Sequence, residues 1–278
     1  MPARGALWSQ GPARQNAAMP LQPTQPLTGL PFEGLQPGRG PWALRELVFP
    51  APLAILVLAP HPDDFDAIGL TLRHLHHHGH ALEVGVLTTG AGGVEDGFAG
   101  AHDAGSKASL REAEQRESCA FFGLPARRLH FLRLWDDAAE EAADRARLQA
   151  WIAERPADLL FMPHGNDSNR THRRTCETVC AIAATLQRQA WACLNQDAKT
   201  LQMRVDLFHE FGEEEAAWKA QLLRFHRSQQ ARNLGTRGIG FDARVLELNR
   251  RAAQALDPRL PYAEAFELMR IGPPRAIP

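Results

Sequence analysis

The chain is organised around one stretch, Ile55-Leu56-Val57-Leu58-Ala59-Pro60-His61-Pro62-Asp63-Asp64-Phe65-Asp66. Its apolar run is too short for a helix and rich in branched residues, so it predicts a buried strand. Two prolines then indicate a turn, and apolar residues recur at helical spacing after it. His61, Asp63 and Asp64 are therefore expected at the carboxyl end of a strand, the edge where open α/β sheets place their ligands.

The acids at this turn have two interpretations. Asp63 and Asp64 could cap the following helix, each stabilising it by about 0.5–2 kcal/mol. Alternatively, His61 and Asp64 bind a metal ion while Asp63 acts as a general base. The second interpretation requires a further ligand from elsewhere in the chain.

A second strand end supplies that ligand. Residues 159–163 are another short apolar run, and the polar stretch from His164 to His172 separates them from a helical pattern. His172 is therefore expected at the same edge of the sheet as His61 and Asp64. Two imidazoles and one carboxylate match the ligand set of a catalytic zinc ion, which keeps one position open for water.

These two motifs resemble those of the PIG-L/LmbE-like zinc-dependent de-N-acetylases, which hydrolyse the acetamide of N-acetylglucosaminyl compounds. The first family motif reads roughly Ala-His-Pro-Asp-Asp-Glu, and this chain has Pro60-His61-Pro62-Asp63-Asp64-Phe65-Asp66. The second resembles Asp-x-His-Pro-Asp-His-Arg, and this chain has Asp167-Ser168-Asn169-Arg170-Thr171-His172-Arg173. The resemblance covers about residues 53–270. It implies that the metal ligands are His61, Asp64 and His172 and that the base is Asp63.

The resemblance also implies residues that bind the substrate. Arg111 is similar to a family residue that contacts substrate hydroxyls; its alternative role is an exposed ion pair with Glu114, one turn away. Asp136 is a candidate for substrate contact or for orienting a neighbouring histidine. His226 either closes over the substrate or is a core histidine.

Two departures from the family pattern bear on the mechanism. Asn169 stands where the family often has a histidine that polarises the carbonyl or stabilises the oxyanion. Asparagine can donate a hydrogen bond to an oxyanion but carries no positive charge, and His164 could take over part of that role. Phe65 replaces an acid, and Asp66 could supply that carboxylate one residue later.

Composition excludes several classes of protein. The chain has 278 residues with 31 basic and 32 acidic side chains, so no global field would attract nucleic acid. No apolar run approaches the roughly 20 residues that span a bilayer, and no signal pattern opens the chain, so the expected location is the cytoplasm. Residues 1–50 are rich in Pro and Gly and are expected to form an N-terminal extension to a single domain over residues 51–278. The composition is also compatible with an oligomer.

Two further clusters of potential ligands have simpler interpretations. His172, Cys176 and Cys180 share one face of a helix, where core packing is favoured over a second metal site. Five histidines between positions 74 and 80 lie mostly at a helix end, which favours a solvated face.

Strand and helix patterns alternate along the chain and predict an α/β fold: a mainly parallel, Rossmann-like sheet with helices on both faces. Further strands are expected at 82–88, 129–134, 192–194 and 203–207, and a glycine-rich loop at 233–241.

The expected function is a hydrolase that uses Zn²⁺, with Fe²⁺ as the alternative ion, to remove the N-acetyl group from an N-acetylglucosamine-type sugar or glycoconjugate. The alternatives are a non-catalytic sugar- or metabolite-binding protein and an amidohydrolase acting on a non-sugar amide. A nucleotide-sugar transferase is disfavoured, since the loop at 89–93 lacks the spacing of a phosphate cradle.

Overall fold

The computed structural model describes residues 32, 35–135, 141–185 and 189–272. Within them, one sheet has the strand order β1-β7-β8-β6-β5-β2-β3-β4. The strands are β1 (Trp42–Ala43), β2 (Ala54–Ala59), β3 (Ala81–Val86), β4 (Leu129–Phe131), β5 (Leu159–Pro163), β6 (Ala190–Asn195), β7 (Leu207–Phe211) and β8 (Tyr262–Ile271). β8 pairs antiparallel with β6 and β7, and the other pairs are parallel. The expected mainly parallel sheet is thus confirmed.

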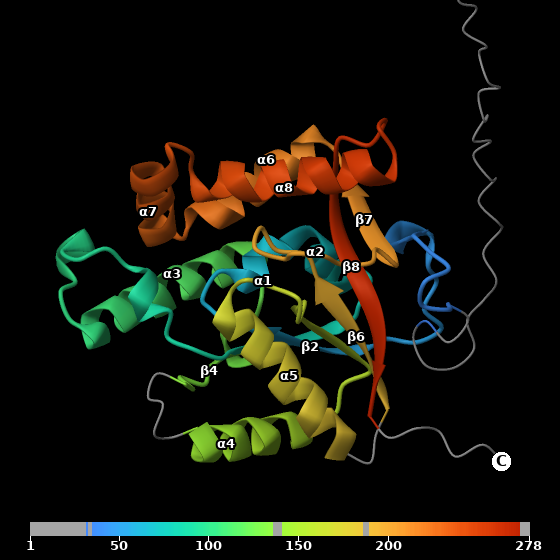
Figure 1. Ribbon diagram of the computed structural model, residues 1–278, viewed down its shortest axis with the longest axis horizontal. Coiled ribbons are helices and arrows are strands. Elements are labelled where there is room, and N and C mark those ends of the chain that lie inside the picture. The colour runs from blue at the N-terminus through green and yellow to red at the C-terminus, as the bar shows by residue number, and fades with distance from the viewer. Residues whose placement is uncertain (1–31, 33–34, 136–140, 186–188, 273–278) are drawn as a thin grey trace, which may run out of the picture.

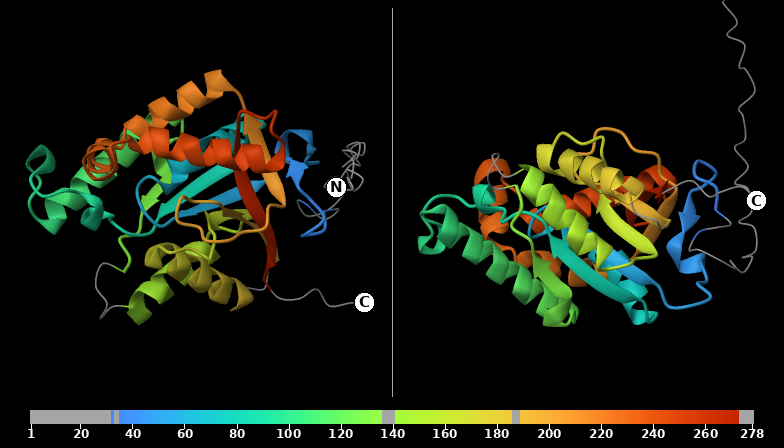
Figure 2. Two further views of the ribbon diagram at one scale, coloured as in Figure 1. Left: turned by 45° about the horizontal axis from the view of Figure 1, so that its top comes forward. Right: turned by 90° about the horizontal axis from the view of Figure 1, so that it is seen from below.

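Helices cover both faces of this sheet (Figures 1 and 2). Two of them, α4 (Glu141–Ala153) and α5 (Arg170–Thr185), lie on one face. The opposite side carries α1 (Asp64–Ala67), α2 (Gly69–His77), α3 (Ala104–Phe122), α6 (Glu213–Arg224), α7 (Arg227–Arg237) and α8 (Phe241–Leu256). This arrangement is an α/β domain with its sheet in the middle.

Strand β2 is buried on both faces of the sheet, and this is why every one of its residues is apolar. Ile55 and Val57 belong to the core cluster that includes Leu72 of α2, whereas Leu56 belongs to the cluster that includes Val179 of α5. Successive side chains of a strand point to opposite faces, so a central parallel strand needs apolar residues throughout. Polar side chains begin only beyond the carboxyl end of this strand, at the edge of the sheet.

The described part of the N-terminal extension packs on the domain. Phe32 is fully buried, with its ring 5.9 Å from that of Trp191. Strand β1 (Trp42–Ala43) adds to the edge of the sheet beside β7, and Leu44 joins the core. No helix within the described residues is long and apolar enough to cross a membrane.

Three sequence predictions were wrong in detail. The strand expected at 203–207 lies later, as β7 (Leu207–Phe211), because its alternating burial begins at Leu207. The loop expected at 233–241 is helical up to Arg237, at the end of α7. Within the histidine run, His77 and His78 are exposed as expected, but His80 is buried and its Nδ1 accepts a hydrogen bond from the backbone N–H of Leu53 at 3.0 Å.

Candidate active site

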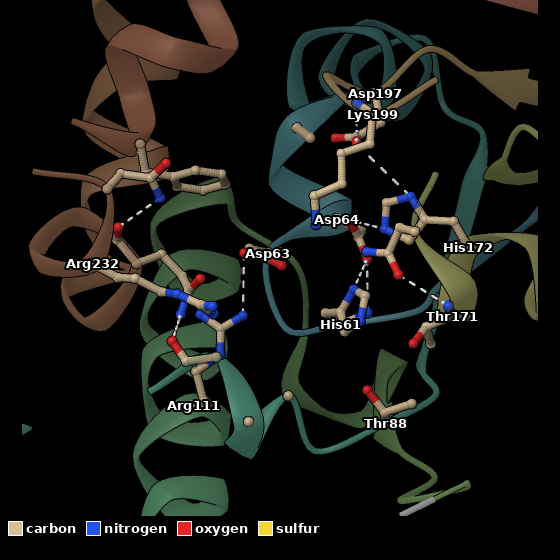
Figure 3. A pocket seen from close by; sticks show the side chains of 18 of the residues that line it. His61, Asp63, Asp64, Thr88, Arg111, Thr171, His172, Asp197, Lys199 and Arg232 are labelled. Atoms are coloured by element: carbon tan, nitrogen blue, oxygen red, sulfur yellow. Dashed lines mark hydrogen bonds and ion pairs between the residues drawn. The ribbon is translucent and has the colours of Figure 1, made fainter. Parts of the chain in front are cut away.

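A pocket of about 390 Å³ opens at the carboxyl edge of the sheet (Figure 3). Its floor comes from the segments that follow β2, β3, β4, β5 and β6, and its outer wall comes from α7 and α8. This is the edge predicted from the sequence. The polar residues that line it are His61, Asp63, Asp64, Thr88, Arg111, Asn169, Thr171, His172, Asp197, Lys199, Gln229, Arg232, Asn233 and Arg244.

The turn after β2 folds around the carboxylate of Asp64. Its Oδ2 accepts a hydrogen bond from the backbone N–H of His61 at 2.7 Å and lies 3.1 Å from Nδ1 of the same residue. The prolines on either side of His61 end the strand, and Asp64 opens α1. Local chain geometry therefore holds the first two candidate ligands together.

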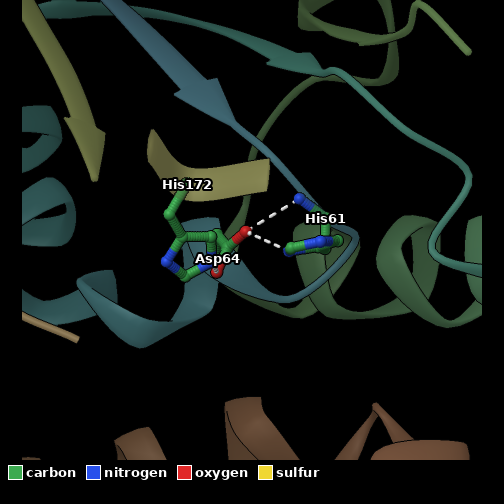
Figure 4. A group of neighbouring side chains, drawn as sticks. All are labelled: His61, Asp64 and His172. Atoms are coloured by element: carbon green, nitrogen blue, oxygen red, sulfur yellow. Dashed lines mark hydrogen bonds and ion pairs between the residues drawn. The ribbon is translucent and has the colours of Figure 1, made fainter. Parts of the chain in front are cut away.

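His172 reaches this pair from the first turns of α5 (Figure 4). Its Nε2 lies 3.6 Å from Oδ1 of Asp64, and its ring centre lies 5.3 Å from that of His61. One ligand atom from each of the three residues falls within 4.8 Å of the others. Strands β2 and β5 are paired neighbours in the sheet, which is why residues over a hundred positions apart meet here.

Asp167 holds the other side of the His172 ring. The Asp167 side chain is buried, and its Oδ2 lies 3.3 Å from Nδ1 of His172 and 3.3 Å from the hydroxyl of Thr200. A carboxylate on Nδ1 favours the tautomer that leaves Nε2 free to bind a metal. Asp167 thus orients the imidazole toward Asp64.

The electrostatics of the cluster favour a bound cation. Burial lowers the pKa of His172, but the carboxylates of Asp64 and Asp167 raise it by more, and the resulting pKa is about 9. Burial raises the pKa of Asp64, but His172 and His61 outweigh it and hold that pKa well below its usual range. The negative charge gathered here therefore attracts either a proton or a metal ion. With converging nitrogen and oxygen donors, the three residues fit a divalent metal such as zinc.

Asp63 faces a different partner from its neighbour Asp64. Its Oδ2 lies 3.2 Å from Nη2 of Arg111, a buried residue of α3. Nη1 of Arg111 lies 3.7 Å from Glu114, which in turn accepts two hydrogen bonds from Ser228 at 2.7 Å each. The exposed ion pair considered for Arg111 and Glu114 is wrong, because both side chains are buried and Arg111 lines the pocket.

Asn169 lies at the start of α5 and lines the pocket. Its Oδ1 accepts a hydrogen bond from the backbone N–H of Thr171 at 3.0 Å. This bond fixes which side-chain atom is the oxygen, so the amide group Nδ2 is left as a donor. Asn169 therefore caps the helix, and its amide nitrogen is available as a donor at the lining of the pocket.

Residues 56–183 match the family model described as PIG-L, GlcNAc-PI de-N-acetylase. Over these residues, the chain is similar to the PIG-L family. The match contains all three candidate metal ligands together with Asp63, Arg111 and Asn169. A search of curated proteins gave no match.

Several solved structures share the fold of this protein. The N,N'-diacetylchitobiose deacetylase from Pyrococcus horikoshii has a TM-score of 0.64 at 18% identity, covering 78% of this chain and 84% of that one. A teicoplanin deacetylase in a zinc-inhibited form has a TM-score of 0.58 at 13% identity, covering 78% and 98%. The 4-carboxy-2-hydroxymuconate hydratase from Pseudomonas putida has a TM-score of 0.57 at 16% identity, covering 81% and 98%. Because one neighbour is a hydratase, the fold alone does not fix the reaction.

His164, His226 and Asp66, which were considered for the site, lie elsewhere in the structure. His164 does not line the pocket, and its Nε2 lies 3.4 Å from Glu267. His226 is fully buried and its Nε2 lies 2.7 Å from Oδ2 of Asp66, so it is a core histidine. Asp66 therefore does not supply the carboxylate that Phe65 lacks, since one residue along a helix turns the side chain by about 100°. Asp136 lies outside the described residues.

Sequence reasoning missed several residues of the pocket. Asp197 and Lys199 follow β6, although the rule that flagged the ends of β2 and β5 applies equally to that strand. Burial raises the pKa of Asp197, whose Oδ1 lies 3.9 Å from Nδ1 of His172. Arg232 and Arg244 come from α7 and α8, beyond the PIG-L match, and no short motif marks them.

Proposed function

We propose that this protein is a metal-dependent hydrolase that removes the N-acetyl group from an N-acetylglucosamine-type sugar or glycoconjugate. Zn²⁺ is the proposed ion, and Fe²⁺ is the alternative. The observation that carries the proposal is the convergence of His61, Asp64 and His172 within 4.8 Å at the floor of a pocket that also contains Asp63. Similarity to the PIG-L family supports amide hydrolysis as the reaction class.

The metal would be held by His61, Asp64 and Nε2 of His172, three protein ligands of the kind that catalytic zinc sites use. When bound, such an ion acts as a Lewis acid and lowers the pKa of water to about 7. Asp167 keeps His172 oriented for this task through its contact with Nδ1.

Asp63 is the proposed general base. It lies beside the ligand Asp64 in the sequence, yet Arg111 holds its Oδ2 at 3.2 Å, so the carboxylate is oriented independently of the three ligands. Asp63 accepts a proton from the attacking water and returns it to the nitrogen of the departing amine. Arg111 acts through Asp63 as a positioning residue.

Asn169 is the proposed donor to the oxyanion. The hydrogen bond from the backbone N–H of Thr171 fixes the orientation of the Asn169 amide. Its Nδ2 would therefore donate to the oxyanion without a change in side-chain conformation. Because asparagine is uncharged, this donor cannot also serve as an acid, which leaves the proton transfer to Asp63.

The direct test is an assay of acetate and free amine released from N-acetylglucosamine glycosides. The purified protein is treated with a chelator and then reloaded with Zn²⁺ or Fe²⁺. The proposal predicts that release stops on metal removal and returns on reloading. A protein that binds the sugars with its metal in place but releases no acetate would instead be a non-catalytic binding protein.

A further inference from the structure

The outer wall of the pocket carries positive charge that the proposed reaction does not use. Arg232 of α7 and Arg244 of α8 both line the pocket, and Lys199 lines it after β6. Figure 3 shows Arg232 on one side of the pocket, with Asp63 between it and the group that contains Lys199, Asp64 and His172. All three cations lie outside residues 56–183, the part that matches the family model.

Within the part of the chain that the structure describes, two of these cations lack carboxylate partners of the kind that other arginines of the same helices have, and Arg232 has only a weak one. Arg227 pairs with Glu117 at 2.6 Å and Arg250 with Glu247 at 2.8 Å, and neither arginine lines the pocket. Among the described residues, no carboxylate lies within 4.0 Å of the side-chain nitrogens of Arg244 or Lys199.

Arg232 has one weak partner. Its Nε lies 3.5 Å from Glu95, and both side chains are about half exposed. A solvated pair of this kind contributes little, about 0–1 kcal/mol, so a better anion would displace Glu95 readily.

The wall is held firmly against the floor of the pocket. The side chain of Gln229 donates a hydrogen bond to the carbonyl of Gly93 at 3.0 Å, and that of Gln230 accepts one from the backbone N–H of Phe241 at 2.8 Å. These bonds fix α7 against the glycine loop and against the start of α8. A Cβ atom at Gly93 would lie 3.4 Å from Nη1 of Arg232, so the guanidinium lies directly on that loop.

We propose that Arg232 and Arg244, on the two helices of the outer wall, form a subsite for an acidic group, a carboxylate or a phosphate, carried by the substrate away from its acetamide. This inference rests on the proposed function and names the substrate class more closely. Guanidinium groups bind both anions through paired hydrogen bonds, and weakly paired or unpaired guanidinium groups beside a pocket favour an anionic ligand over a neutral one. The acetylated sugar is therefore an acidic glycoconjugate rather than a neutral one.

The test compares three β-N-acetylglucosaminides with aglycones of similar size, one neutral, one bearing a carboxylate and one bearing a phosphate monoester. Acetate release by the metal-loaded protein gives kcat/KM for each. The subsite predicts that at least one acidic compound exceeds the neutral one by about tenfold or more, and that added salt reduces the difference. The double variant Arg232→Gln, Arg244→Gln should reduce that preference about tenfold. Arg237→Gln, an exposed position of α7 outside the pocket, should leave it unchanged.

Calorimetric binding of the corresponding free-amine compounds separates this inference from the proposed function. If no compound releases acetate, the proposed function fails, while tighter binding of an acidic compound that the double variant loses would still support the subsite. If the neutral compound is hydrolysed or bound as well as both acidic ones, the subsite is wrong. The same holds if the double variant weakens all three compounds equally.

Discussion

Oδ2 of Asp63 lies 3.2 Å from Nη2 of Arg111, whereas the next residue, Asp64, contacts His61 and His172. Two carboxylates adjacent in the sequence therefore have separate partners: an arginine for one and two imidazoles for the other. This separation allows one acid to bind a metal while the other handles a proton.

Replacing Asp63 by Asn should separate these two tasks. Asn cannot accept the proton but keeps the size of the side chain, so turnover should fall by about 10²–10⁴-fold. Metal content, measured by mass spectrometry on the same preparation, should stay at the wild-type level. Full activity in Asp63→Asn would show that another group is the base.

Asp167→Asn tests the residue behind the metal ligand His172. The variant keeps an oxygen for the backbone N–H of Asn169, a bond of 2.6 Å, but loses the charge beside Nδ1 of His172. Metal affinity should fall about 10–100-fold in a competition titration against a chelator. Ser168→Ala, an exposed neighbour, is the control and should bind metal like the wild type. Unchanged affinity in Asp167→Asn would assign Asp167 a purely structural role.

Asn169 has a helix-capping role and a proposed oxyanion role, and two variants distinguish them. Asn169→Asp keeps an acceptor for Thr171 but loses the amide donor, so stability should hold while turnover falls about 10²–10³-fold. Asn169→Ala loses both and should also reduce the free energy of unfolding by about 1 kcal/mol. Urea unfolding and steady-state kinetics measure the two effects. Wild-type turnover in Asn169→Asp would remove the oxyanion role.

His209 should make stability depend on pH. Burial, His74 and Arg45 lower the pKa of His209 to about 3, and its Nδ1 is buried without a hydrogen-bond partner. The ordinary pKa of about 6.5 applies to the unfolded chain, so below that pH the unfolded state binds a proton that the folded state excludes. The free energy of unfolding should therefore fall as the pH falls, by about 2 kcal/mol from this residue between pH 7 and pH 5.

The variant His209→Gln lacks this titration and should lose less stability over the same range, as measured by urea unfolding at both pH values. The exposed His102→Gln is the control and should follow the wild type. Equal losses in the wild type and His209→Gln would contradict the assignment.

The floor of the site could be predicted from the sequence because parallel strands place their carboxyl ends at one edge. Short apolar runs that end in polar residues marked β2 and β5, and that was enough to bring His61, Asp64 and His172 together. Nothing beyond the strand pattern and the turn residues was needed for this part.

The wall could not be predicted in the same way. The sequence allows Arg111 either an exposed ion pair or a place in the site, and its burial depends on how α3 packs against the turn after β2. His226 contacts Asp66, which lies 160 residues earlier in the sequence, and no local pattern encodes such a contact. Arg232 and Arg244 face the pocket because α7 and α8 fold over it, which is a property of tertiary packing.

The central claim is that one metal ion joins two distant loops, and the metal content of the purified protein tests it most directly. After dialysis, the wild type should retain about one zinc or iron ion per chain, and both His61→Ala and His172→Ala should lose it while remaining folded by circular dichroism. A wild type that retains no divalent metal and hydrolyses its substrate in the presence of a chelator would contradict the account.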